Sequence, residues 1–120
     1  MIRFIHRGMG GKYTNYISQA IRNIARCQAI EFSSNTPSSP GYRVAISKSG
    51  QPLTASELKD ILSKQNITFF LGDSKGLPKE ILDESDAVYS VSSLNVPHQL
   101  EAAILIGEVE SLLRAGRGDV

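Results

Sequence analysis

The sequence predicts a single α/β domain built on a parallel sheet. Strand-like and helix-like segments alternate along its 120 residues, and the strand-like segments are short runs rich in β-branched and aromatic residues. Such alternation is typical of parallel sheets whose strands are joined by right-handed helical crossovers. We expect residues 1–120 to form one domain, because this length supports one hydrophobic core.

The first half of the chain supplies three of the expected strands. Apolar residues at strand or helix spacing mark each element, and residues rich in glycine, serine and proline separate the elements. The expected elements here are a strand at 2–5, a helix at 13–25, strands at 29–32 and 42–46, a loop at 33–41 and a turn at 49–52.

The second half opens on a helix start. Thr54 is a good N-cap and Glu57, three residues later, completes a capping box, so a helix is expected through Leu62. Pro78 and Pro97 each suit the first turn of a helix, because their fixed φ matches the helical backbone. We expect strands at 67–71 and 87–89, and helices at 78–84 and 97–113.

Composition excludes several classes of protein. Hydrophobic residues make up 41% and charged residues 21% of the chain, which is ordinary for a globular protein. Cys27 is the only cysteine, which excludes an internal disulfide and a cysteine metal cluster, and we expect it to fill a helix face. His6 and His98 are far apart without a ligand cluster, so no metal is expected. No apolar stretch suits a signal peptide or a membrane span, so the expected location is the cytoplasm.

The net charge of +1 hides an asymmetry along the chain. Residues 1–48 hold seven basic residues and one acidic residue, whereas residues 49–120 hold six basic and eleven acidic residues. A basic half can be the footprint of a phosphate backbone. It can equally be a solvated face that pairs with the acidic half.

A glycine-rich turn at 8–11 precedes Lys12 and the first expected helix. Such a turn between strand and helix can cradle a phosphate. The run lacks the spacing and the hydroxyl after lysine that a nucleotide-binding P-loop needs, and glycine turns are common. The nucleotide interpretation is therefore the weaker one.

Two of the expected strands are followed by segments suited to a ligand. Gly72 closes the strand at 67–71, and a run of small polar residues at 90–95 follows the strand at 87–89. Backbone groups in such a run have no ladder partner, so they need water, a side chain or a ligand. Ligands of open α/β sheets bind beyond the carboxyl ends of the strands. On its residues alone, the run is either an ordinary polar turn or a binding loop.

Two motifs at this edge resemble the knotted methyltransferases of the SPOUT class. They read Leu71-Gly72-x-x-x-Gly76-Leu77 and Tyr89-Ser-Val-Ser-Ser-Leu-Asn-Val-Pro-His-Gln-Leu100. The chain is most similar to the ribosomal RNA large-subunit methyltransferase H family, the pseudouridine N3-methyltransferases. The likeness extends upstream through 44–52 and, more weakly, to the first strand. It implies a three-layer α/β fold with a parallel-rich sheet and a C-terminal deep trefoil knot.

The resemblance also implies a cofactor, S-adenosyl-L-methionine. It marks the main chain of the serine-rich loop and one residue at each of two strand ends for contact with that cofactor. The cofactor-binding residues so marked are Ile46, Gly72, Ser92, Ser93, Leu94, Asn95, Val96 and Pro97. A side chain at position 72 would stand where the cofactor approaches the backbone, so we expect glycine to be required there.

Neither the residues nor the resemblance assigns a catalytic residue. His98 is a candidate base, a phosphate contact or an ordinary first-turn helix residue, and Asp73 and Glu101 are nearby acidic candidates. Methyl transfer from a sulfonium is an in-line displacement for which positioning can do much of the work.

The implied activity is methylation of RNA, expected to be large-subunit ribosomal RNA, by a homodimer that pairs through its C-terminal helix. Gly107 lies inside that helix, where it costs about 1 kcal/mol relative to alanine, so it is expected to permit a close approach. The apolar residues Ile104 and Ile106 suit an interface, and packing of the helix on its own sheet is the alternative.

The chain departs from the resembled family at groups that would meet RNA. Lys75 replaces an acidic residue in the glycine turn, Ala102 replaces an arginine, and a basic, aromatic C-terminal tail is absent. The alternative function is therefore a catalytically silent α/β-knot dimer that serves as an RNA-binding or regulatory module.

Overall fold

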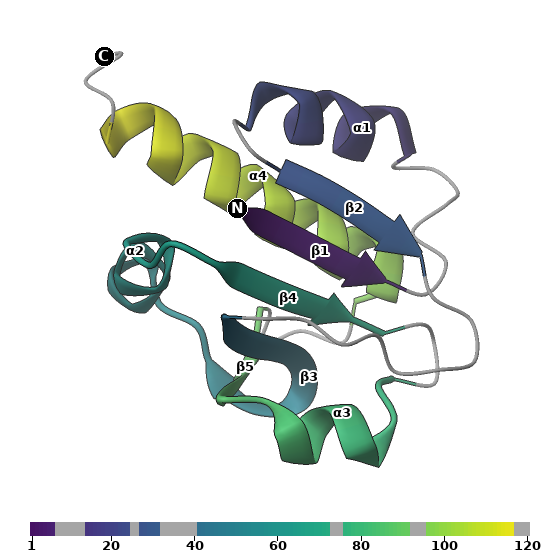
Figure 1. Ribbon diagram of the computed structural model, residues 1–120. Coiled ribbons are helices and arrows are strands. Elements are labelled where there is room, and N and C mark those ends of the chain that lie inside the picture. Colours follow the sequence, from purple (N-terminus) through teal and green to yellow (C-terminus); the bar gives the residue numbers. More distant parts are fainter. Residues whose placement is uncertain (7–13, 25–26, 32–40, 73–75, 92–95, 117–120) are drawn as a thin grey trace.

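A computed structural model of the chain shows strands that form one sheet with helices packed on its faces (Figure 1). It describes residues 1–6, 14–24, 27–31, 41–72, 76–91 and 96–116. In chain order, the elements are β1 (Ile2–His6), α1 (Thr14–Asn23), β2 (Cys27–Glu31), β3 (Tyr42–Pro52), α2 (Ala55–Leu62), β4 (Ile67–Leu71), α3 (Lys79–Glu84), β5 (Ala87–Ser90) and α4 (His98–Gly116).

The sheet confirms the predicted parallel α/β class. Its five strands lie in the order β2-β1-β4-β3-β5, and every neighbouring pair is parallel. β4 occupies the centre and is buried along its whole length, as its continuous apolar run predicts. Because all five strands run the same way, their carboxyl ends meet at one edge.

Helices cover both faces of this sheet, which gives three layers (Figure 1). Phe4 and Phe69 point to one face, where their rings stack at 5.3 Å and pack with residues of α1, α2 and α4. The next residues along these strands, Ile5 and Phe70, point to the other face and pack against Ile81 of α3. The main core therefore lies between the sheet and the three helices α1, α2 and α4.

Three expectations about local structure were wrong. The turn expected at 49–52 is part of β3, because the strand resumes its pairing with β5 there. Cys27 begins β2 rather than filling a helix face, and it is half-buried against the main core. Pro78 is the N-cap residue of α3, one position before the helix begins.

Gly107 permits the close helix approach that its position predicted. A methyl group at this residue of α4 would overlap the hydroxyl of Tyr16 on α1. Ile106, expected at an interface, is fully buried in the main core of its own chain. Ile104 and Tyr16 remain exposed, at 37% and 54%.

Candidate functional site

The candidate site is the edge where the carboxyl ends of β1, β4 and β5 meet. β1 pairs with β4 so that His6 lies opposite Leu71, the residue before Gly72. β5 ends at Ser90, and the chain then leads through Val91 toward the helix start at Pro97. The glycine turn and the serine-rich segment thus leave the sheet at the same edge, as the sequence predicted.

The turn after β4 is packed too tightly for a side chain at its first residue. A Cβ atom at Gly72 would lie 2.6 Å from the carbonyl carbon of Gly76 and 2.9 Å from the amide nitrogen of Leu77. Gly76 itself has φ +83°, a conformation that favours glycine. The backbone of the turn therefore requires both glycines, independently of any ligand.

The serine-rich segment is only partly described. Ser92, Ser93, Leu94 and Asn95 lie outside the described residues, as do Asp73 and Lys75 in the glycine turn. Val96 is half-buried, and Pro97 is exposed and accepts a hydrogen bond from the Glu101 amide at 3.0 Å. α4 therefore begins at His98, one residue after Pro97, which ends the expected binding loop.

Ile46 stands at the same edge but faces the core. Its register partners are Leu71 of β4 and Tyr89 of β5, and only 3% of its surface is exposed. A bound molecule could meet this residue only at its small exposed remainder or its backbone.

Next to Ile46, β3 loops out of the sheet. Both Ile46 and Gln51 are in register with Tyr89, so residues 47–50 form an insertion in the strand. The Ser47 and Ser49 hydroxyls share a hydrogen bond of 2.9 Å within the insertion. A side chain at Gly50 would come within 2.7 Å of the Tyr89 amide nitrogen, so the insertion closes tightly on β5.

This insertion carries Lys48, whose charge acts on Glu101 in the first turn of α4. Burial raises the pKa of the half-buried Glu101 carboxyl, whereas the charges of Lys48 and His98 lower it. Lys48, His98 and Glu101 thus form a titratable cluster beside Pro97. The sequence marked His98 and Glu101 as candidates and missed Lys48, because the turn expected at 49–52 did not reveal that the chain loops out there toward α4.

A hydrogen-bond network fixes the end of β5 to the start of α2. Glu57 accepts hydrogen bonds from the Thr54 hydroxyl at 2.9 Å and the Thr54 amide at 3.2 Å, which confirms the capping box. These bonds lower the pKa of Glu57, and the Tyr89 hydroxyl also donates to its carboxylate. Burial, with a smaller contribution from Glu57, raises the pKa of Tyr89. The Leu53 amide donates to the Ser90 carbonyl at 2.9 Å.

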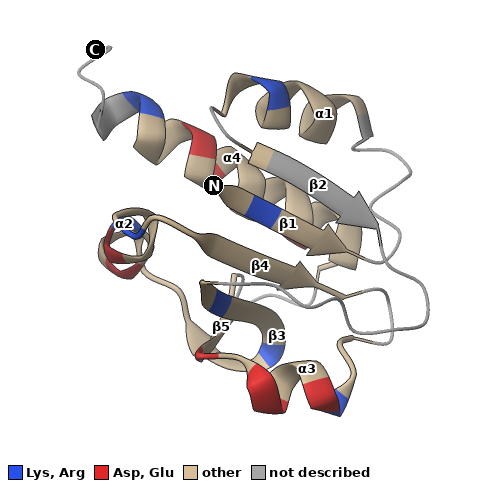
Figure 2. Cartoon of the chain, viewed as in Figure 1, with Lys and Arg blue, Asp and Glu red and all other residues tan. Residues whose placement is uncertain are grey.

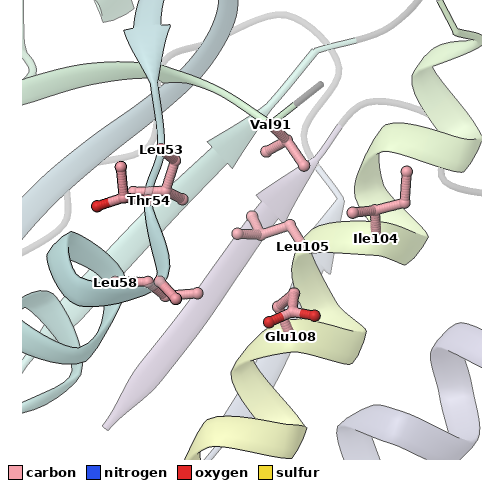
Figure 3. A pocket seen from close by; sticks show the side chains of 8 residues that line it. Leu53, Thr54, Leu58, Val91, Ile104, Leu105 and Glu108 are labelled. Atoms are coloured by element: carbon pink, nitrogen blue, oxygen red, sulfur yellow. The ribbon is translucent and has the colours of Figure 1, made fainter. Parts of the chain in front are cut away.

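A small hollow lies between α2, α4 and the residue after β5 (Figure 3). Its walls include the side chains of Leu53, Leu58, Val91, Ile104 and Leu105, with Glu108 also contributing. The hollow encloses about 120 Å³. Small-molecule sites usually enclose roughly 300–1,000 Å³, so this hollow alone is too small for a nucleoside cofactor.

Basic side chains do not gather at the candidate site among the described residues. Figure 2 shows Lys and Arg spread over helices and strands on several sides of the molecule. Arg3 and Arg43 are each the second residue of their strand, near the amino ends, and Arg22 lies in the last turn of α1. Lys48 alone of the described basic residues in 1–48 approaches α4 at the candidate edge. The phosphate-backbone interpretation of the basic half gains no support from this distribution.

Cys27 has no reactive environment. Burial raises the pKa of its thiol to about 11, and the charge of the N-terminus lowers it by a smaller amount. Since the thiolate is the nucleophilic form, Cys27 is protonated and inert at neutral pH.

The family comparison decides the affiliation of this chain. The family described as "Predicted SPOUT methyltransferase" matches residues 12–117. The chain belongs to the SPOUT methyltransferase family. The motifs at the carboxyl edge, which suggested this family from the sequence, lie inside the matched region.

Curated relatives named ribosomal RNA large subunit methyltransferase H match part of the chain. The protein of Carboxydothermus hydrogenoformans is 31% identical over 90 residues, which cover 70% of this chain and 55% of the relative. The protein of Prochlorococcus marinus strain MIT 9515 is 28% identical over 78 residues, which cover 62% of this chain and 57% of the relative. The matched segments thus span about half the length of these relatives.

Solved structures share the fold of this SPOUT chain. The SpoU methyltransferase AviRb from Streptomyces viridochromogenes superposes with a TM-score of 0.64 at 12% identity, covering 96% of this chain and 60% of that one. A probable methylase family protein from Haemophilus influenzae Rd KW20 gives a TM-score of 0.60 at 9% identity, covering 98% of this chain and 66% of that one. At these identities the likeness concerns the fold alone.

The described residues contain neither a candidate metal site nor a helix that could span a membrane. Within the parts of the chain that the structure describes, no three His, Cys, Asp or Glu side chains gather to hold a metal ion. Among the same residues, no helix combines the length and the apolar character needed to cross a membrane.

Proposed function

We propose that this SPOUT chain is an S-adenosylmethionine-dependent RNA methyltransferase whose substrate is large-subunit ribosomal RNA, at N3 of a pseudouridine. The family match over residues 12–117 carries the proposal. The names of the curated relatives support the ribosomal substrate, and the resemblance of the edge motifs to the pseudouridine N3-methyltransferases supports the target atom.

The residues at the carboxyl edge fit the cofactor by their chemistry. S-Adenosylmethionine would supply the methyl group from its sulfonium. We propose that the backbone of Ser92, Ser93, Leu94, Asn95, Val96 and Pro97 holds the adenosine portion, with Ile46 and Gly72 beside it. The half-buried Val91 and Val96 offer apolar surface for a ring, and the neighbouring Lys48 and Glu101 offer opposite charges.

Three further properties belong to this proposal. We propose that residues 1–120 act as one domain, that the C-terminal segment forms the deep trefoil knot of the SPOUT class, and that the protein works in the cytoplasm. The fold of the SpoU methyltransferase AviRb, which covers 96% of this chain, supports the shared architecture on which the knot proposal rests.

We also propose that two copies pair through α4. Ile104 and Tyr16 are the large apolar side chains that remain exposed among the described residues, and they belong to the packed helices α4 and α1. Ile104 also borders the hollow beside α2, which a side chain of a second copy could fill. Burial of these groups in a dimer would remove apolar surface from water.

The second candidate function is a catalytically silent dimer that binds RNA or regulates a partner. Ala102, at the position where the resembled family has an arginine, is 2% exposed and packs in the main core. This position therefore presents no cation to an RNA. The scattered basic side chains of the described residues offer no gathered positive surface for RNA, so they favour the regulatory role of this candidate over its RNA-binding role.

Methyl transfer from labelled cofactor distinguishes the two functions. The purified protein would be incubated with S-adenosylmethionine labelled in its methyl group and either free large-subunit RNA or assembled ribosomal subunits that lack the modification. Mass spectrometry of the nucleosides should then detect labelled N3-methylpseudouridine. Cofactor binding without label in either RNA would support the silent dimer instead.

A further inference from the structure

The insertion in β3 and the first turn of α4 place three titratable side chains beside the proposed cofactor loop. Residues 47–50 leave the sheet between Ile46 and Gln51, and this insertion carries Lys48. His98 and Glu101 are three residues apart at the start of α4, so they lie on neighbouring turns of one helix face. The cluster therefore joins two elements that are separate in sequence.

The environment of Glu101 disfavours the ionised form of its carboxyl group. It is half-buried, and burial raises the pKa of its carboxyl. Lys48 from β3 and His98 from α4 are the groups whose charges favour the ionised form. A partly desolvated carboxylate beside a cleft or loop is a candidate functional group, since packing alone would favour an apolar or neutral residue there.

We propose that Lys48 and Glu101 bind the amino-acid end of S-adenosylmethionine, which rests on the proposed function. The Lys48 ammonium would bind the α-carboxylate of the cofactor, and the Glu101 carboxylate would bind its α-ammonium. The methionine end is a zwitterion with adjacent opposite charges, and a lysine beside a carboxylate presents the complementary charges. Charge-assisted hydrogen bonds of this kind are the strong ones in proteins.

The position of the cluster matches this role. Lys48 is two residues beyond Ile46 on β3. The Glu101 amide donates a hydrogen bond to the carbonyl of Pro97, the last residue of the proposed adenosine loop. The adenosine and methionine ends of one molecule would thus contact consecutive segments of the same edge. The proposal concerns affinity and leaves the catalytic residues unassigned.

Two ligands that differ by the amino-acid group test the proposal. S-Adenosylhomocysteine carries the zwitterion, whereas 5′-methylthioadenosine has the same nucleoside and thioether without it. Their dissociation constants would be measured by calorimetry for the wild-type protein, Lys48→Met and Glu101→Gln. We expect each substitution to weaken S-adenosylhomocysteine binding about tenfold or more and to leave 5′-methylthioadenosine binding unchanged.

Control variants and a folding measurement make every outcome decisive. Lys59→Met on α2 and Glu84→Gln on α3 remove the same charges from exposed positions and should bind both ligands like the wild type. Equal losses for both ligands in Lys48→Met and Glu101→Gln would mean that the cluster only supports the fold, and unchanged binding of both would also overturn the proposal. If the wild-type protein, with a normal thermal unfolding transition, binds neither ligand, the proposed function fails together with this inference.

Discussion

Gly72 is needed by the turn in which it lies. The backbone of Gly76 and Leu77 occupies the space that a Cβ atom would take, at 2.6 and 2.9 Å. Backbone atoms cannot move aside as the end of a flexible side chain can. The sequence predicted a clash with the cofactor at this position, and the structure shows a clash with the protein's own turn.

Gly72→Ala should therefore destabilise the protein by about 2 kcal/mol, since the turn must shift to admit the methyl group. Urea unfolding followed by circular dichroism would measure the loss. Gly76→Ala provides a comparison, because its Cβ atom would meet open space and only the positive φ opposes it. Wild-type stability of Gly72→Ala would contradict the packing of this turn.

Glu101 makes stability depend on pH in a predictable direction. Burial raises the pKa of this carboxyl above its ordinary value, so the folded state binds its proton more tightly than the unfolded state does. The ionised group therefore opposes folding, and this penalty develops as pH rises from the unfolded pKa through the raised folded pKa. Below both values the penalty is absent.

Glu101→Gln removes this penalty. The gain in unfolding free energy of the variant over the wild type should be larger at pH 7 than at pH 4, as measured by urea unfolding at both values. Glu84→Gln, at an exposed position, provides the control for loss of a carboxylate. A difference between Glu101→Gln and the wild type that is constant with pH, or that reverses in sign, would contradict the burial of this carboxyl.

At the scale of the elements, the start of α2 is tied to the end of β5. Glu57 accepts hydrogen bonds from Thr54 within the capping box and from Tyr89 near the end of β5. The capping box was readable from the sequence because both partners lie three residues apart. The bond to Tyr89 was not, because only the fold brings residues 57 and 89 together.

Thr54→Ala should cost about 1 kcal/mol of folding free energy, because the helix loses its N-cap. Tyr89→Phe keeps the ring and removes only the hydroxyl bond to Glu57. If Glu57 couples the two residues, the double variant should differ from the sum of the single variants in urea unfolding. Strict additivity would show that the cap and the strand end act independently.

The same scale explains which parts of the fold the sequence could predict. The run at 67–71 is apolar throughout and could only be a buried strand, which β4 is. Residues 49–52 carry turn chemistry, but pairing with β5 overrides it and extends β3 through Pro52. Gly72 and Pro97 thus indicated, from the sequence, where the candidate site lies. Lys48 was missed because its place depends on a loop-out set by pairing between distant strands.

At the scale of the whole molecule, the exposed side of α4 that carries Ile104 is the expected dimer surface. Ile104 is 37% exposed and borders the hollow beside α2, so a charge there would not disturb the core of one chain. Ile104→Lys should give a monomer in sedimentation equilibrium where the wild type gives a dimer. Glu84→Lys, on α3 at the other face of the sheet, should remain dimeric. A wild-type monomer at all concentrations would contradict the pairing.

The whole-molecule account depends most directly on cofactor binding. The fold, the family match and the convergence of the glycine turn and serine-rich segment at one edge all lead to an S-adenosylmethionine site. Calorimetric titration of the purified wild-type protein with S-adenosylmethionine should give saturable binding of one molecule per chain. The absence of any binding by the folded protein would contradict the account and turn attention to its macromolecular partners.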